Sequence, residues 1–173
     1  FGDTDELLIS LDAGSGEKHW DHEGFNGLEQ FRDAPAVHRD EAIVHDTESE
    51  IAAFDREDGQ KRRLYNRDDL LFQTPVTVQD DALFFGTDRG IHAYEDFADG
   101  PPTERWHVPT EEGVETGLAV TDDFVYGLDA SAGKLYAVST GGDEPEWEVS
   151  MWTGIESGPI VVDNQVVVPT LDR

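Results

Sequence analysis

Closely spaced histidines and dense acidic turns are the residues of this sequence that suggest metal chemistry. His19 and His22 form a His-x-x-His pair, a spacing that can chelate zinc when both side chains lie on one face of a helix. On a β-strand, residues three apart point to opposite faces, so the pair cannot converge there. The acidic turns 3–6 and 55–59 offer oxygen ligands for Ca²⁺, yet neither follows the spacing of a calcium-binding loop. We therefore predict no metal site in this chain.

The glycine-rich turns and the candidate nucleophiles also lack the partners that catalysis needs. Gly14 and Gly16 lack the third glycine of a dinucleotide-binding loop, and Gly133-Lys134 lacks the flanking residues of a phosphate-binding loop. The chain contains no cysteine, and no Gly-x-Ser-x-Gly elbow occurs in it. We predict that these glycines form turns and that the chain has no catalytic residues.

The elements that must position these residues are short strands that recur with a fixed period. Taking Pro35, Pro75, Gly117 and Pro159 as equivalent gives steps of 40, 42 and 42 residues. Each is followed by an apolar strand, an acidic or amide-bearing turn, and a second short apolar strand. Four short strands in a unit of about 40–45 residues is the period of a propeller blade. The sequence predicts an all-β fold, a β-propeller of four-stranded antiparallel blades with four blade repeats.

The phase of the repeats predicts a single domain, residues 1–173, with three whole blades and two half-blades. The whole blades are expected at about 34–66, 74–108 and 116–149. Residues 1–22 supply third and fourth strands, and 157–173 supply first and second strands, so together they predict a split blade. Three assemblies fit: a four-bladed ring in one chain, a homodimer that closes an eight-bladed ring, or a fragment of a larger propeller.

Residues 11–20, L-D-A-G-S-G-E-K-H-W, resemble the repeat of PQQ-like (quinoprotein-type) propellers, which runs roughly A-L-D-x-x-T-G-x-x-x-W. Residues 126–138 resemble a second hairpin of the same family, and together the partial matches cover nearly the whole chain. A large flat ring in the fourth strand can pack between blades, with its N–H bonded to a backbone carbonyl. We predict this inter-blade docking role for Trp20, Tyr65, Trp106 and Trp147.

The resemblance implies two kinds of relative. Some members are quinoprotein dehydrogenases that bind PQQ and a calcium ion on the propeller axis, and others are scaffolds without a cofactor. The dehydrogenases often carry an adjacent cysteine pair and use a much longer ring, so the sequence favours a scaffold without a cofactor. Enzymatic activity is left open, with the balance of residues against it, and a segment of a PQQ- and Ca-dependent oxidoreductase is the alternative.

The charge balance constrains the environment and the partners. The chain holds 39 acidic and 12 basic residues, a net charge of −27, spread along its whole length. Such a dispersed acidic surface is expected of a protein in multimolar salt, where screening removes self-repulsion. We interpret the source as a halophile, an archaeon, and expect an extracellular or cell-surface location. Nucleic acids and anionic membrane surfaces are excluded as partners, because both need basic patches.

The functional hypothesis from sequence is therefore a non-catalytic scaffold that binds an unidentified protein or small ligand. A second alternative is a glycan-binding module. Trp152 lies outside the repeat-docking positions, which makes it the candidate ligand contact.

Overall fold

The computed structural model describes residues 7–23, 33–45, 50–66, 70–98, 100–151, 155 and 157–170. Within them lie sixteen strands and no α-helix, and no segment there is a helix long and apolar enough to cross a lipid bilayer. Trp152 and the acidic turn 3–6 lie outside the described residues. The strands are β1 (Leu7–Leu11), β2 (Lys18–Glu23), β3 (Ala36–His38), β4 (Glu41–His45), β5 (Glu50–Asp55), β6 (Lys61–Asn66), β7 (Thr77–Gln79), β8 (Ala82–Thr87), β9 (Gly90–Glu95), β10 (Thr103–Pro109), β11 (Ala119–Val120), β12 (Phe124–Asp129), β13 (Lys134–Ser139), β14 (Pro145–Ser150), β15 (Ile160–Val162) and β16 (Gln165–Val167).

Twelve of these strands form three four-stranded antiparallel meanders: β3–β6, β7–β10 and β11–β14, here called the first, second and third blades. They span residues 36–66, 77–109 and 119–150. The ranges predicted from the sequence were 34–66, 74–108 and 116–149. The prediction of an all-β fold of four-stranded antiparallel blades is confirmed. Each blade is a continuous hairpin chain because short strands that alternate apolar and polar residues pair most readily with their sequence neighbours.

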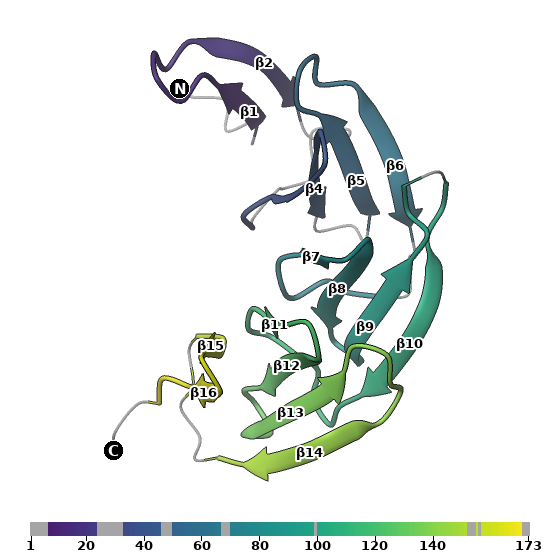
Figure 1. The fold of residues 1–173 in the computed structure, drawn as a ribbon, viewed down its shortest axis with the longest axis vertical. Coiled ribbons are helices and arrows are strands. Elements are labelled where there is room, and N and C mark those ends of the chain that lie inside the picture. Colours follow the sequence, from purple (N-terminus) through teal and green to yellow (C-terminus); the bar gives the residue numbers. More distant parts are fainter. Residues whose placement is uncertain are drawn as a thin grey trace.

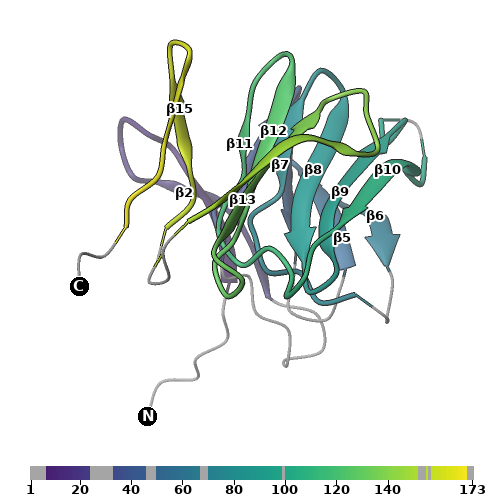
Figure 2. The same cartoon turned by 90° about the horizontal axis from the view of Figure 1, so that it is seen from below.

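The blades are arranged side by side around an open crescent (Figure 1). The first strand of each blade lies on the concave side, and the fourth strand lies on the convex side. Two hairpins end the crescent: β1–β2 at one end, here the N-terminal hairpin, and β15–β16 at the other, the C-terminal hairpin. Figure 2 shows both hairpins on the same side of the three blades. The chain is thus a partial propeller.

In this structure the two hairpins are separate two-stranded sheets, and the described residues form no pairing between them. The split blade predicted from residues 1–22 and 157–173 is therefore not assembled within the described part of one chain. Its halves remain available for another partner, and the split blade stays a prediction.

The core lies between blades rather than inside one sheet. Phe84 and Trp106 of the second blade pack in one apolar cluster with Val125 and Tyr136 of the third. A second cluster joins the first and second blades. Because each blade buries its faces against its neighbours, the register of every fourth strand decides which side chains enter these interfaces.

Candidate functional site

Two tryptophans fasten one blade to the next through their ring N–H groups. Trp20 in β2 donates to the backbone oxygen of Arg56, 3.0 Å away, in the turn that follows β5. Trp106 in β10 donates to the backbone oxygen of Thr140, also at 3.0 Å, in the turn that follows β13. The Trp106 bond runs from the fourth strand of one blade to the turn after the third strand of the next, and the Trp20 bond runs to the corresponding turn of the first blade from β2 of the N-terminal hairpin. Trp106 is 4% exposed, so its bond is shielded from water.

The turn under Trp20 has a glycine where the ring lies. Gly59 has a φ of +74°, and a Cβ built there would lie 2.8 Å from Cδ2 of Trp20. The positive φ favours glycine, and the close approach of the ring excludes any side chain. Asp55 shapes this turn by accepting hydrogen bonds from the amides of Glu57 and Asp58. The Asp–Gly turn thus forms a flat seat for the indole.

The turn after β1 has the same construction. Asp12 accepts hydrogen bonds from the amides of Gly14 and Ser15, and Gly16 has a φ of +73°. The hydroxyl of Ser15, followed by these amides, holds the pKa of Asp12 below its usual range. A Cβ built on Gly16 meets no atom of the described residues within 4 Å, so none of them covers this turn as Trp20 covers Gly59.

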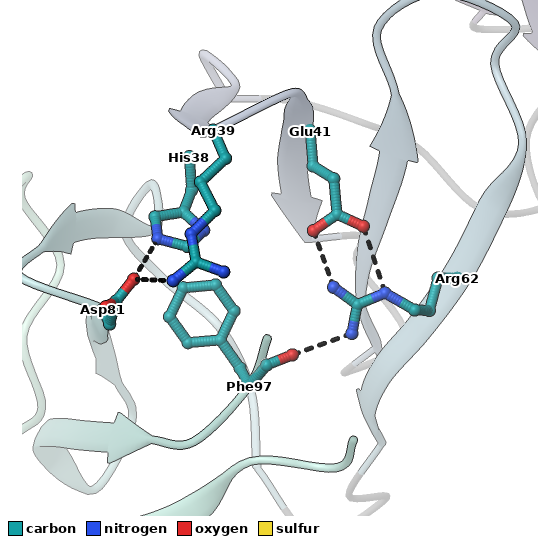
Figure 3. Close-up of polar contacts among 6 residues, drawn as sticks. All are labelled: His38, Arg39, Glu41, Arg62, Asp81 and Phe97. Atoms are coloured by element: carbon teal, nitrogen blue, oxygen red, sulfur yellow. Dashed lines mark hydrogen bonds and ion pairs between the residues drawn. The ribbon is translucent and has the colours of Figure 1, made fainter. Parts of the chain in front are cut away.

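In the first blade, an arginine occupies the position that tryptophan holds elsewhere. Trp20 lies opposite Ser10, Trp106 opposite Ala93, and Trp147 opposite Ala137. The equivalent residue of the first blade, Ala53, lies opposite Arg62. Nη1 of Arg62 donates to the backbone oxygen of Phe97, 2.7 Å away in the second blade (Figure 3).

Glu41 holds the Arg62 guanidinium in place by accepting two further bonds, from Nε at 3.1 Å and from Nη2 at 2.6 Å (Figure 3). This planar, two-point pairing orients the remaining donor toward the next blade. Arg62 therefore makes the type of inter-blade bond that the ring N–H of tryptophan makes from the equivalent position of other sheets. The neighbouring basic residues are also paired, because Lys61 and Arg63 both contact the buried carboxylate of Glu50, at 2.6 and 2.7 Å.

Tyr65 still contacts the second blade, although in a different register. It lies opposite Ile51, two residues before Ala53 in β5. Its hydroxyl lies 2.6 Å from the hydroxyl of Tyr94, which in turn donates to Glu104 at 2.7 Å. Burial, together with these two hydrogen bonds, raises the pKa of Tyr94 far above its usual range. The hydrogen bond between the two tyrosine hydroxyls therefore joins the first blade to the second.

A third contact joins the same blades at the turns between first and second strands. Asp81 accepts from Nε2 of His38 at 2.5 Å and from Nη2 of Arg39 at 3.1 Å (Figure 3). The His38 hydrogen bond holds the pKa of Asp81 below its usual range. The His38 ring also packs against Phe97, with ring centroids 4.7 Å apart.

His19 and His22, the pair predicted not to form a zinc site, lie in different surroundings. His22 packs edge-on against Phe54, with ring centroids 4.9 Å apart, and His19 lines a hollow beside β1. Among the described residues no group of three or more His, Asp or Glu side chains is arranged to hold a metal ion.

Trp147 differs from the other predicted docking residues because its side chain has no blade in front of it. It packs edgewise on Tyr126, with ring centroids 5.9 Å apart, and is 39% exposed. The structure thus brings Trp20, Tyr65 and Trp106 against a following blade and leaves Trp147 at the end of the crescent. Trp152, the candidate ligand contact, lies outside the described residues.

A sequence profile described as outer membrane protein assembly factor BamB matches residues 2–147. The chain belongs to this family. The BamB family consists of PQQ-like propeller repeats, so the resemblance found in the sequence is confirmed at the family level. No curated protein matches the chain.

Solved structures show the same fold at low sequence identity. BamB from Moraxella catarrhalis matches with a TM-score of 0.69 and 17% identity, over 96% of this chain and 53% of that one. The computationally designed Ika8 protein matches with a TM-score of 0.71 and 15% identity, over 95% and 52% of the two chains. The designed Ika4 protein matches with a TM-score of 0.67 and 17% identity, over 86% and 88%. The chain spans about half the length of BamB and Ika8.

Proposed function

We propose that the chain is a non-catalytic scaffold, a propeller segment whose rigid blades bind a protein or a small ligand. The observation that carries this proposal is the use of its polar side chains. His38, Arg62 and Tyr94 have the chemistry of catalytic residues, yet each bonds across the junction of the first and second blades. Side chains used in this way fix the blades relative to one another, which is what a binding scaffold requires.

The concave side offers one surface that suits such a role. A hollow of about 510 Å³ lies between the third blade and the C-terminal hairpin, lined in part by Asp122, Asp123, Asp163 and Asn164. Tyr126 and Val166 also line it, so its lining mixes polar and apolar side chains. Mixed linings of this kind hold a ligand by burial and orient it by a few hydrogen bonds.

The family supports the same reading. BamB is by its name an outer membrane protein assembly factor, and the name mentions no reaction. For this chain we propose a location outside the cell or at its surface, in the salt-rich environment of a halophile, and no cofactor. The net charge of −27 supports the salt-rich environment, because salt screens the repulsion among the carboxylates.

The test is a titration of PQQ in multimolar KCl with Ca²⁺, followed by tryptophan fluorescence and visible absorbance. We expect no saturable change up to the micromolar range, with Ca²⁺ alone as the control for a metal effect. Saturable binding of PQQ that depends on Ca²⁺ would overturn the scaffold proposal and favour a quinoprotein oxidoreductase.

A further inference from the structure

Polar side chains at the ends of first strands bridge two of the junctions between neighbouring blades. By register, His38, Gln79 and Thr121 are equivalent, because each stands directly before the turn that leads to the second strand of its blade. His38 contacts the carboxylate of Asp81 in the second blade. Gln79 donates from Nε2 to Oδ1 of Asp122 in the third blade, at 3.0 Å. In both cases the bridge runs to a turn carboxylate of the next blade.

The next junction, between the third blade and the C-terminal hairpin, lacks such a bridge. The hydroxyl of Thr121 donates to the backbone oxygen of Phe124 and accepts from its amide, both at 3.1 Å, so it is used within its own blade. Within the described part of the chain, no side-chain bond links the third blade to Asp163 or Asn164 in the turn of the hairpin. The hairpin lies beside the third blade (Figure 1), and the hollow of about 510 Å³ opens between their turns.

Aromatic and apolar side chains make up part of the lining. Val161 and Val166 of the hairpin pack in one apolar cluster with Tyr126 of the third blade, and all three line the hollow. Phe124 lines it as well, and its ring centroid lies 6.0 Å from that of Tyr126 with 37° between the ring planes. The faces of aromatic rings attract cations, and most strongly where water is excluded.

The charged groups of the lining have one sign. Among the described residues around the hollow they are the carboxylates of Asp122, Asp123 and Asp163, and no Lys, Arg or His lines it there. Asp123 and Asp163 are exposed and make no side-chain bond to a described residue, while Asp122 accepts only from the neutral amide of Gln79. By contrast, Asp81 at the junction of the first and second blades has basic partners. The hollow therefore combines uncompensated negative charge with aromatic surface.

We infer that this hollow binds a small organic ammonium ion, whose charge faces Asp123 and Asp163 and whose apolar groups pack against Tyr126 and the valines. The inference rests on the proposed binding role and names its ligand class. A volume of about 510 Å³ lies within the range of about 300–1,000 Å³ that small-molecule sites have. A hydrated inorganic cation would make no use of the rings and valines, and an anion would be repelled.

Calorimetric titration with benzyltrimethylammonium chloride tests the ligand class. Salt weakens the attraction of exposed carboxylates, so the titration uses the lowest KCl concentration at which circular dichroism shows the folded chain. One probe molecule per chain should bind saturably. Benzyl alcohol and benzenesulfonate are neutral and anionic probes of similar size, and they should bind at least about 10-fold more weakly. No saturable binding of the cation, or equal affinity for benzyl alcohol, would overturn the inference.

A charge variant tests the carboxylates. Asp163→Asn should lower the affinity about 2–5-fold, the size of an exposed ion pair. Asp163 has a φ of +52°, which asparagine tolerates, so the variant changes the charge without straining the turn. Asp96→Asn is the matched control, because Asp96 is also exposed, has a φ of +61° and does not line the hollow. Equal affinities of these two variants would remove the carboxylate from the site.

A pair of ring variants tests the aromatic surface. Tyr126→Leu should lower the affinity about 3–30-fold, whereas Tyr126→Phe keeps the ring and should keep the affinity. Circular dichroism checks that both variants fold. If Tyr126→Leu folds and binds the probe as tightly as Tyr126→Phe does, the ring has no part in the site and the inference is wrong.

Valine methyl NMR signals locate the bound probe. The signals of Val161 and Val166 should shift during the titration, and that of Val37, which lines a different hollow beside β1, should not. Shifts at Val37 alone would contradict the assignment. A short lysine-containing peptide that binds at least about 10-fold more tightly than the probe would also contradict it, and would indicate a lysine of a protein partner.

The result is independent of the test of the scaffold proposal. Failure of the ammonium probe to bind overturns the ligand class alone, whereas Ca²⁺-dependent binding of PQQ overturns the scaffold whether or not the ammonium probe binds.

Discussion

Replacing Gly59 with alanine tests whether the flat turn of the first blade is a seat for Trp20. The new Cβ would lie 2.8 Å from the ring, so Trp20 must lift from the turn. The control is Gly16→Ala, which has nearly the same φ but nothing above it. Both variants carry the cost of a left-handed alanine, about 1–2 kcal/mol. The difference in unfolding free energy between the two variants therefore measures the clash with the Trp20 ring alone.

That difference can be worked from the contacts. Overpacking a well-filled site costs about 1–3 kcal/mol, and losing the bond from Trp20 to Arg56 costs about 1 kcal/mol more. Gly59→Ala should therefore be about 2–4 kcal/mol less stable than Gly16→Ala. In a domain of this size, that corresponds to a Tm lower by about 5–15 °C.

The assay is thermal unfolding followed by circular dichroism in multimolar KCl, at a protein concentration low enough for the chain to be monomeric. The Trp20→Ala background closes a double-mutant cycle, because the extra cost of Gly59→Ala should disappear when no ring is present. Equal destabilisation by the two glycine variants would refute the packing of Trp20 on this turn. An extra cost of Gly59→Ala that persists without Trp20 would refute it as well.

Three further outcomes follow from the blade junctions. Trp106→Phe should lower the unfolding free energy by about 1–3 kcal/mol, because the oxygen of Thr140 loses its donor in a buried position, and urea titration measures this. Because its pKa is raised in the folded state, Tyr94 stabilises the fold fully below about pH 10 and loses that contribution as the pH rises further; tyrosinate absorbance should therefore show it ionising together with unfolding, and Tyr94→Phe should remove that signal. Asp81 has a lowered pKa, so its contribution is complete above about pH 4 and is lost as the pH falls. Asp81→Asn should flatten the acid limb of the stability curve measured by urea midpoints, and an unchanged limb would contradict the His38–Asp81 contact.

The repeat period predicted the fold well because each blade is a local meander. Strands that pair with their sequence neighbours need only alternation and turn residues to be located, and both are visible in the chain. The same locality places Trp20, Trp106 and Trp147 at equivalent positions of their own sheets. Long-range information was needed only for the junctions between blades.

The first blade shows what counting residues along a fourth strand leaves out. In the three sheets that carry a docking tryptophan, the extra residue of the β-bulge directly precedes the ring: His19, Arg105 and Glu146. In the first blade the extra residue is Leu64, which comes after Arg62. A bulge shifts the register of every later residue by one place, and its position cannot be read from the sequence. The repeat pattern therefore indicated Tyr65 as the docking residue and gave no sign of Arg62. A hint was present in the donor chemistry, since Arg62 is the residue near this position with N–H groups to donate.

The empty seat at Gly16 was hidden for a different reason. The sequence shows that turns 12–16 and 55–59 are alike, but it does not show which of them an indole covers. Coverage depends on which sheet packs against the turn, and this is a long-range contact that the repeat pattern does not state.

Because the docking bonds of Trp20 and Trp106 run to the blade that follows, each of these two indoles is an intrinsic optical probe of that neighbour as well as of its own sheet. Trp20 senses the first blade, and Trp106 senses the third. The second blade receives Arg62 in place of a ring, so it has no such reporter upstream. If the crescent melts blade by blade, the emission of Trp20 should change with the loss of the first blade, and the emission of Trp106, which packs on Phe84 of its own blade and bonds to Thr140, should change with the loss of the second or the third.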